Sequence, residues 1–371
     1  MKMNDRCDTV YDVAVVGAGP AGAIFAKELA ADGKPLRILL IDGQREEKSK
    51  PCGGLLAPDA QKVLAEFDLT LPRSVLADPQ IFAVETIDLA KKCVRYYQRH
   101  YLNMNRYAFD RWLLSLVPET VTVLNARCVG ICESDGKYTL TLECENEKFK
   151  VTANSIVGAD GGGSTVRRTL IGRMPKQYVS IQEWYESRSD NTKSIHRMPY
   201  YSCIFDRKTS DSCSWTIHKD GYVIFGGAFD KQGCREAFEA QKNRLEGFIG
   251  TGFGAPVKRE ACLVTSPRRM GDFNCGKPCV YLLGEAAGFI SASSFEGISS
   301  AILSGRLLAE AFREGDDHEV IAKLYKQKTR RLRFKLFCKT FKRWVLCTPA
   351  TRHMIMKSGI QAIEPQASKK G

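Results

Sequence analysis

The hydrophobic pattern near the start of the chain predicts a strand, a glycine turn and a helix, in that order. An apolar run at 13–16 is typical of a buried strand, and helix-forming residues occupy 23–31. The turn between them reads Gly17-x-Gly19-x-x-Gly22. In this context Gly17 permits a tight turn, Gly19 lets the backbone approach a pyrophosphate, and Gly22 lets helix and strand pack closely. The pattern predicts a nucleotide site at the N-terminus of the helix.

A second apolar run, 37–41, ends in an acidic residue. Asp42 stands 20 residues after Gly22, where a carboxylate accepts the hydroxyls of an adenosine ribose. We therefore predict a site for an adenine dinucleotide. At this point NAD and FAD are both open.

Runs rich in β-branched and aromatic residues come next. Strands are predicted at 81–88 and 93–101, and Asn105 is placed to cap a helix. A small sheet is predicted from strands at 121–132, 138–143 and 149–152. The first unit is thus expected to be Rossmann-like and interrupted by antiparallel structure.

The middle of the chain, 177–229, alternates as antiparallel strands do, and Lys-Asp-Gly at 219–221 is typical of a hairpin turn. An amphipathic helix is predicted at 235–249. We expect a second domain whose sheet covers a substrate cavity. The candidates for the cavity wall are Trp184, Tyr185, Trp215 and Ile217. Ordinary sheet packing is the alternative for each.

Two later segments also have a strand, a turn and a helix. An apolar strand at 155–158 leads to Asp160-Gly161, where a Ser and an Arg at the head of a helix can bind phosphate or ribose. A strand at 280–283 leads to another turn, and a helix is predicted over 299–313. Each segment alone also fits a simple strand–helix connection.

The turn at 284–288 reads Gly-Glu-Ala-Ala-Gly. Its carboxylate, Glu285, is suited to hold the ribityl hydroxyls of a flavin. A helix that begins near Gly297 would point its positive end at the flavin ring. A loop at 51–54, Pro-Cys-Gly-Gly, lets backbone approach a flat or phosphorylated ligand, and a plain turn is the alternative.

Composition narrows the class of protein. A chain of 371 residues suits two or three domains, and no run of eighteen apolar residues predicts a membrane span. The N-terminus does not resemble a signal peptide. Fourteen cysteines are scattered without a Cys-x-x-Cys pair, which disfavours metal sites and a disulfide framework. We expect a cytoplasmic protein.

The net charge of +13 is concentrated in the last segment. From Lys326 to Gly371 there are thirteen Lys or Arg and one acid, a net of 13 − 1 = +12. Within 326–346, one helix face carries Phe334, Phe337, Phe341 and Val345, and another carries Arg331, Lys335, Lys339 and Lys342. A basic amphipathic helix of this kind either binds the anionic inner surface of a membrane or packs on the protein with its Lys and Arg side chains in solvent. Both remain open, and nucleic acid is disfavoured because no recognised module accompanies the charge.

Three of these elements together carry a resemblance to a known family. In order and spacing, the turn at 17–22, Asp160-Gly161 and the turn at 284–288 resemble the FAD-dependent oxidoreductases built like p-hydroxybenzoate hydroxylase. Within that group the chain is most similar to the geranylgeranyl reductases, and specifically to their bacterial CbrA branch. The CbrA likeness extends along nearly the whole chain and is carried by 50–61, 220–228 and 284–294.

The resemblance implies non-covalent FAD lying extended across the first domain. The residues that it implies at the cofactor are Gly17, Gly19, Pro20, Ala21, Gly22, Asp42, Cys52, Gly53, Gly54, Arg106, Asp160, Gly161, Gly284, Glu285, Ala286, Gly288, Gly297 and Ile298. Cys52 would lie beside the flavin ring, as a proton donor or a ring contact. His218 would be an acid or a structural residue in the substrate cavity. The departures from the family pattern are Leu55, Cys213, His218 and Glu285.

The expected architecture is mixed α/β and α+β. A discontinuous FAD-binding domain is predicted from 1–75, 102–175 and 270–322. An interleaved antiparallel-β substrate domain is predicted from 76–101 and 176–269, and a basic helical segment from 323–371.

The leading hypothesis for the chemistry is hydride transfer from reduced FAD to a carbon–carbon double bond of a polyprenyl or similar apolar lipid. The alternatives are a flavin monooxygenase that hydroxylates a small molecule, and a non-enzymatic flavin-binding membrane adaptor. A halogenase is disfavoured because Cys213 stands where an aromatic residue is needed. Only one complete nucleotide fingerprint is present, so the electron donor is NAD(P)H bound transiently or a redox protein.

Overall fold

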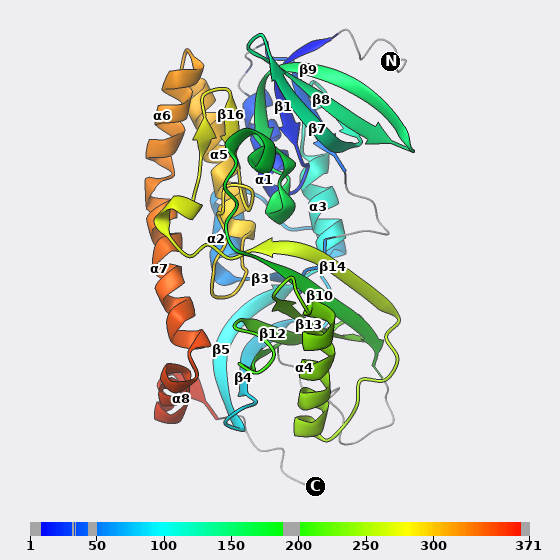
Figure 1. Ribbon diagram of the computed structural model, residues 1–371, viewed down its shortest axis with the longest axis vertical. Helices are drawn as coiled ribbons and strands as arrows, with labels where there is room; N and C mark the ends of the chain where they lie inside the picture. The colour runs from blue at the N-terminus through cyan, green and yellow to red at the C-terminus, as the bar shows by residue number, and fades with distance from the viewer. Residues whose placement is uncertain (1–8, 32, 34, 44–49, 188–200, 365–371) are drawn as a thin grey trace.

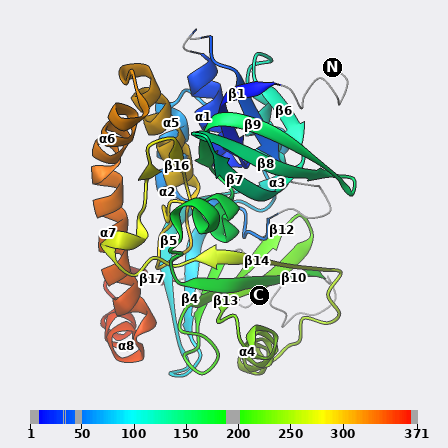
Figure 2. The same cartoon turned by 45° about the horizontal axis from the view of Figure 1, so that its top comes forward.

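The computed structural model describes residues 9–31, 33, 35–43, 50–187 and 201–364. Two sheets lie one above the other along the long axis of the molecule, and the C-terminal helices run down one side of both (Figure 1). A rotated view shows the same arrangement, with α7 and α8 beside the lower sheet (Figure 2). No helix in these ranges is both long and apolar enough to cross a bilayer.

The upper sheet has eight strands within the described residues, and its central strands are parallel. Its path runs β15-β16-β9-β1-β2-β6, with β7 and β8 attached through β9. The strands are β1 (Val10–Val16), β2 (Ile38–Asp42), β6 (Thr122–Asn125), β7 (Arg127–Ser134), β8 (Lys137–Cys144), β9 (Glu147–Gly158), β15 (Gly276–Lys277) and β16 (Val280–Leu282). The predicted Rossmann-like arrangement is confirmed, with β1 between β2 and β9.

Two helices pack against each other beside this sheet. They are α1 (Pro20–Ala30) and α5 (Ile298–Glu314). Gly305 allows the close approach, because a Cβ there would lie 2.5 Å from the carbonyl oxygen of Ala21. Helix α1 begins at Pro20, three residues earlier than its predicted start, since proline is favoured at the first helical position.

The small inserted sheet is not separate from the parallel one. Strand β9 runs through both predicted strands, 149–152 and 155–158, as one element. Its first half pairs antiparallel with β8, and its second half pairs parallel with β1. Because Ala153 is paired on both sides, the backbone stays extended where the sequence suggested a break.

The lower sheet has nine strands among the described residues, in the order β14-β10-β13-β12-β11-β4-β5-β17, with β3 on β5. The strands are β3 (Leu55–Leu56), β4 (Ile81–Asp88), β5 (Cys93–Asn103), β10 (Gln177–Glu186), β11 (Tyr201–Phe205), β12 (Cys213–Lys219), β13 (Tyr222–Phe229), β14 (Lys258–Thr265) and β17 (Ala362–Ile363). The predicted hairpin between β12 and β13 is confirmed. Asp220 and Gly221 both have positive φ, 49° and 80°, as the tight two-residue turn requires.

Helix α4 (Cys234–Ile249) covers one face of the lower sheet. Phe238 of this helix joins Tyr185 and Phe225 of the sheet in one apolar core. Helices α2 (Pro58–Glu66) and α3 (Arg106–Ser115) pack with α1 and α5 in one apolar cluster. Asn105 caps α3 as predicted by accepting a hydrogen bond from the Ala108 N–H.

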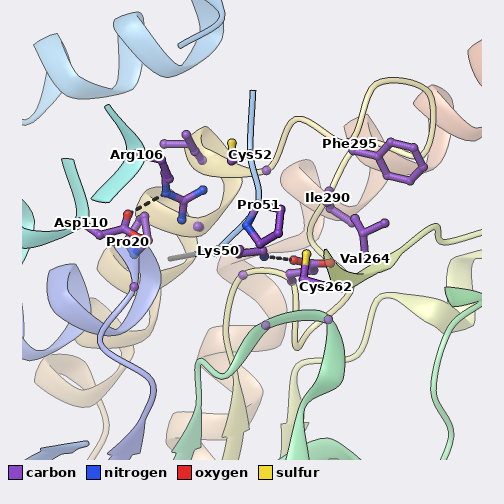
Figure 3. A pocket seen from close by; sticks show the side chains of 18 of the residues that line it. Pro20, Lys50, Pro51, Cys52, Arg106, Asp110, Cys262, Val264, Ile290 and Phe295 are labelled. Carbon is purple, nitrogen blue, oxygen red and sulfur yellow. Dashed lines mark hydrogen bonds and ion pairs between the residues drawn. The ribbon is translucent and has the colours of Figure 1, made fainter. Parts of the chain in front are cut away.

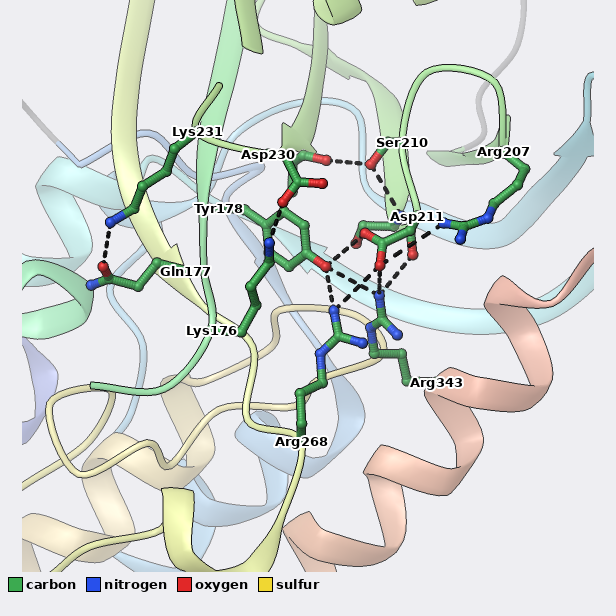
Figure 4. Close-up of polar contacts among 12 residues, drawn as sticks. Lys176, Gln177, Tyr178, Arg207, Ser210, Asp211, Asp230, Lys231, Arg268 and Arg343 are labelled. Atoms are coloured by element: carbon green, nitrogen blue, oxygen red, sulfur yellow. Dashed lines mark hydrogen bonds and ion pairs between the residues drawn. The ribbon is translucent and has the colours of Figure 1, made fainter. Parts of the chain in front are cut away.

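The C-terminal segment comprises α6 (His318–Lys328), α7 (Arg330–Cys347), α8 (Pro349–Ser358) and β17. Helix α7 packs through a face that neither predicted stripe contains: Leu332 and Leu336 enter the core of the upper sheet, and Arg343 reaches the lower one. Arg343 donates to Asp211, which also accepts from the Tyr178 hydroxyl (Figure 4). The helix therefore ties the two halves together.

Candidate active site

A cavity of about 1130 Å³ lies where the two sheets meet. This exceeds the range of about 300–1,000 Å³ that is usual for a pocket with one drug-sized ligand. The upper sheet and its turns contribute Gly17, Asp160 and Gly284, and the lower sheet contributes Trp215 and Ile217. The space is large enough for an extended cofactor together with a substrate.

The glycine turn at 17–22 shapes one end of the cavity. Gly17 has φ of +106°, and a Cβ on Gly22 would lie 1.9 Å from the carbonyl oxygen of Gly17. Gly19 caps α1, and a Cβ there would meet nothing within 4 Å. No side chain caps α1, so its first N–H groups point toward the cavity that Gly19, Pro20 and Ala21 line.

Asp42 ends β2 next to this turn and is buried. Its Oδ2 accepts a hydrogen bond from Arg111 Nη1 at 2.5 Å. The arginine on α3 therefore fixes the carboxylate beside the cavity, which Gly43 lines. Contact of Asp42 with a ribose stays a prediction.

The Asp160 carboxylate forms its hydrogen bonds within its own loop. Its carboxylate accepts from the Ser164 hydroxyl and from the backbone N–H groups of Thr165 and Val166. Burial raises the pKa of Asp160 even though these hydrogen bonds oppose the shift. The predicted helix after it is reduced to two short helical turns, 161–163 and 167–171. Asp160 thus holds the glycines at 161–163 in place along the cavity wall.

Glu285 pairs with a residue that the sequence did not single out. One carboxylate oxygen accepts from the Thr265 N–H at 2.8 Å, and the other accepts from Lys50 Nζ (Figure 3). Burial alone would lower the pKa of Lys50, but the Glu285 charge raises it. Gly162 lies against this carboxylate. Both side chains line the cavity. If Glu285 contacts the ribityl hydroxyls, its carboxylate therefore binds them and the Lys50 ammonium at the same time.

The loop at 52–54 and Arg106 lie together at another part of the wall (Figure 3). Arg106 Nε donates to Asp110 at 2.8 Å, and this carboxylate raises the pKa of the guanidinium against the effect of burial. The Cys52 sulfur accepts from the Gly54 N–H. The predicted cofactor residues Gly284, Gly297 and Ile298 line the same cavity, with Gly297 at the N-terminus of α5. Ala286 and Gly288 are not among the lining residues.

Two of the four predicted wall residues line the cavity, namely Trp215 and Ile217. Tyr185 does not, because it lies under α4 on the opposite face of the sheet, where its hydroxyl contacts Glu183. Trp184 donates its indole N–H to Glu260 at 2.9 Å and lies outside the lining.

His218 is also outside the lining. It directly follows Ile217 on β12, so its side chain points to the other face of the sheet. Its backbone carbonyl accepts from Asn103 Nδ2. The structure therefore gives His218 no position from which it touches a ligand in this cavity.

A polar cluster in the wall was missed by the sequence reasoning. The Tyr101 hydroxyl donates to Glu296 at 3.0 Å, and Arg99 and Ser294 donate to the same carboxylate. Tyr201 lies edge-to-face against Tyr101. Burial raises the pKa of both tyrosines. A neutral phenol hydrogen-bonded to a carboxylate is a candidate proton donor in this cavity. The one sequence feature that could have pointed to this cluster is the position of Glu296 directly before Gly297, a predicted cofactor residue.

The donors in the cavity fit an adenine dinucleotide that ends in a flat ring. The N-terminus of α1 and the open α-carbon of Gly19 suit a pyrophosphate. The N-terminus of α5 and the backbone of the 52–54 loop suit a ring that gains negative charge on reduction. In the described part of the chain, no group of three or more His, Cys, Asp or Glu side chains could hold a metal ion.

Comparison with known proteins agrees with this fit. Residues 10–231 match the family described as FAD binding domain. Protein CbrA of Escherichia coli O6:H1 is 44% identical over 359 residues, which are 95% of this chain and 94% of that protein. The predicted cofactor, FAD, is confirmed.

Solved structures show the same fold. A geranylgeranyl bacteriochlorophyll reductase-like protein from Thermoplasma acidophilum superimposes with a TM-score of 0.74 at 19% identity, over 93% of this chain and 89% of that one. The p-nitrophenol 4-monooxygenase PnpA from Pseudomonas putida DLL-E4 gives a TM-score of 0.67 at 16% identity, over 94% and 93% of the chains. At these identities the likeness concerns the fold alone.

Proposed function

The chain belongs to the CbrA family of FAD-dependent oxidoreductases, and we propose that it reduces carbon–carbon double bonds of a polyprenyl or similarly apolar lipid at a membrane surface. The observation that carries this proposal is the cavity itself. Beyond the segments suited to FAD, its wall includes Trp215, Ile217, Ile290 and Phe295. Such a wall favours an apolar chain over a small polar substrate.

The exposed face of α7 supports a membrane surface as the place of reaction. Phe334, Phe341 and Trp344 are 62%, 67% and 56% exposed, and the rings of Phe341 and Trp344 stack at 5.6 Å. Aromatic side chains in such a basic segment suit the interface of an anionic bilayer. Lys339 Nζ lies 3.4 Å from Asp59, a residue that lines the cavity. The aromatic helix is thus attached to the cavity wall.

An anaerobic reoxidation assay tests the reaction. The bound flavin is reduced without oxygen, and vesicles that carry an unsaturated polyprenyl lipid are added while the flavin absorbance is followed. We expect reoxidation with the unsaturated lipid and none with its fully saturated analogue. A flavin that stays reduced with both lipids, and is reoxidised only when oxygen is admitted, refutes the reductase and favours the monooxygenase.

A vesicle-binding assay tests the surface. We expect Phe341→Ser with Trp344→Ser to weaken cosedimentation with vesicles that contain phosphatidylglycerol. Phe82→Ser is the matched control, because Phe82 on β4 is 63% exposed but lies outside the basic segment. Equal binding by wild type, control and double variant would exclude the helix as the contact. Binding that depends on flavin redox state without any turnover would instead support the adaptor.

A further inference from the structure

We propose that Lys219 is a positioning residue that fixes the loop at 52–54 against the flavin, and that its buried positive charge makes the bound flavin easier to reduce. Lys219 ends β12 and is 3% exposed. It does not line the cavity but lies behind the loop that does. The proposal rests on FAD binding and not on the identity of the substrate.

The ammonium is held by three backbone carbonyls. Nζ donates to the oxygens of Met104 at 2.5 Å, Gly53 at 2.9 Å and Gly54 at 3.4 Å. Three acceptors match the three protons of a charged ammonium group. Gly54 has φ of +65°, and a Cβ on it would lie 2.0 Å from Nζ. A glycine at position 54 is therefore needed for the lysine to reach the loop.

The same contact joins three segments that are distant in sequence. Met104 directly precedes Asn105, the cap of α3, and its N–H donates to the Gly54 carbonyl. The first residue of α3 is Arg106, which lines the cavity. Lys219 therefore sets the position of the 52–54 loop relative to both β12 and the arginine.

Among the described residues, no carboxylate pairs with the charge of Lys219. Within the described ranges Lys219 forms no ion pair, whereas Arg106 is paired with Asp110 and Lys50 with Glu285. Burial lowers the pKa of Lys219 to about 8, while Cys52 and Asp220 nearby act in the opposite direction. At neutral pH an unpaired cation thus lies directly behind the loop.

A fixed cation behind this loop would act on the reduced cofactor more than on the oxidised one. Reduction adds negative charge to the flavin, and a cation in a low-dielectric site stabilises that charge. A purely structural contact would loosen both redox states alike. The ratio of the two affinities therefore separates the charge effect from the positioning effect.

The test compares Lys219→Met and Lys219→Arg with wild type at pH 7. We measure the affinity of the apoprotein for oxidised FAD and the reduction potential of the bound flavin. For Lys219→Met we expect oxidised FAD to bind more weakly, and reduced FAD to lose on the order of tenfold more affinity, which corresponds to a fall of about 30 mV in the potential. In Lys219→Arg the reduction potential of the flavin should stay close to that of wild type, because the positive charge is kept. Lys176→Met, which removes a surface lysine paired with Asp230, is the control.

A second measurement needs no neutral variant. In wild type, the potential should fall more steeply with pH around 8, where Lys219 loses its proton, than in Lys219→Arg, whose guanidinium stays charged. Parallel pH profiles for the two proteins would overturn the charge effect. A folded Lys219→Met variant with wild-type affinity for oxidised FAD would overturn the positioning effect.

Discussion

Substitution of Gly19 by valine should weaken FAD binding at least about 100-fold without unfolding the protein. Gly19 has φ of −69° and ψ of −175°, which any residue can adopt. A Cβ at this position meets no atom within 4 Å, so the apoprotein has room for the side chain. That room is part of the cavity, beside the N-terminus of α1. The valine would therefore displace the pyrophosphate and nothing else.

The magnitude follows from the contacts that would be lost. The Ala23 N–H donates to the Gly19 carbonyl and forms the first backbone hydrogen bond of α1. Pro20 has no N–H, so those of Ala21 and Gly22 remain for the phosphates. Two hydrogen bonds to a charged group at about 1.5–3 kcal/mol each give about 3–6 kcal/mol. With about 1.4 kcal/mol per tenfold, the affinity should fall about 100- to 20,000-fold.

The assay is titration of the apoprotein with FAD, followed by flavin fluorescence, with circular dichroism as the check on folding. Gly247→Val is the matched control. Gly247 lies in α4, is exposed, and likewise has no atom within 4 Å of a built Cβ. A folded Gly19→Val protein that retains stoichiometric flavin would refute the placement of the pyrophosphate.

Three further predictions concern the buried ion pairs and the polar cluster. Arg352→Met should lower the free energy of unfolding by about 3–5 kcal/mol, because it leaves the buried Asp88 carboxylate without its partner at 2.9 Å; an unchanged urea midpoint would contradict this. Glu183 has a lowered pKa, since hydrogen bonds and ion pairs outweigh its burial. The stability that Glu183 contributes is therefore fully present above the pKa it has in the unfolded chain, and it is lost as the pH falls through its lower pKa in the folded protein. Glu183→Gln should thus make the melting temperature depend less on pH on the acid side. Tyr101→Phe removes the hydroxyl bonded to Glu296 and should slow reoxidation by substrate on the order of 100-fold while FAD affinity stays unchanged, as stopped-flow absorbance would show.

Local signals in the sequence were sufficient for much of the fold. The glycine turn at 17–22, the cap at Asn105 and the hairpin turn at 220–221 each depend on a few neighbouring residues. Their conformations follow from rules that act within one turn of chain. For this reason the strands and helices around them were predicted in the right order, although β1 and α1 each begin three residues earlier than predicted.

Features that depend on distant partners could not be predicted. The stripe of aromatics on α7 was visible, but its buried face is set by the cores that Leu332 and Leu336 enter. Tyr185 was assigned to the cavity because alternation identifies two faces without saying which one α4 covers. Lys219 and Lys50 were missed because their partners, backbone carbonyls and Glu285, lie far away in the sequence.

The most direct test of the proposed activity is the mass of the lipid after one anaerobic turnover. Enzyme with fully reduced FAD is mixed with an unsaturated polyprenyl lipid in vesicles. The lipid is then extracted, and its molecular mass is measured by mass spectrometry. The account predicts a gain of two hydrogens per lipid, with one lipid converted for each flavin reoxidised. An unchanged lipid without oxygen, together with a product that gains an oxygen atom when oxygen is admitted, would contradict it.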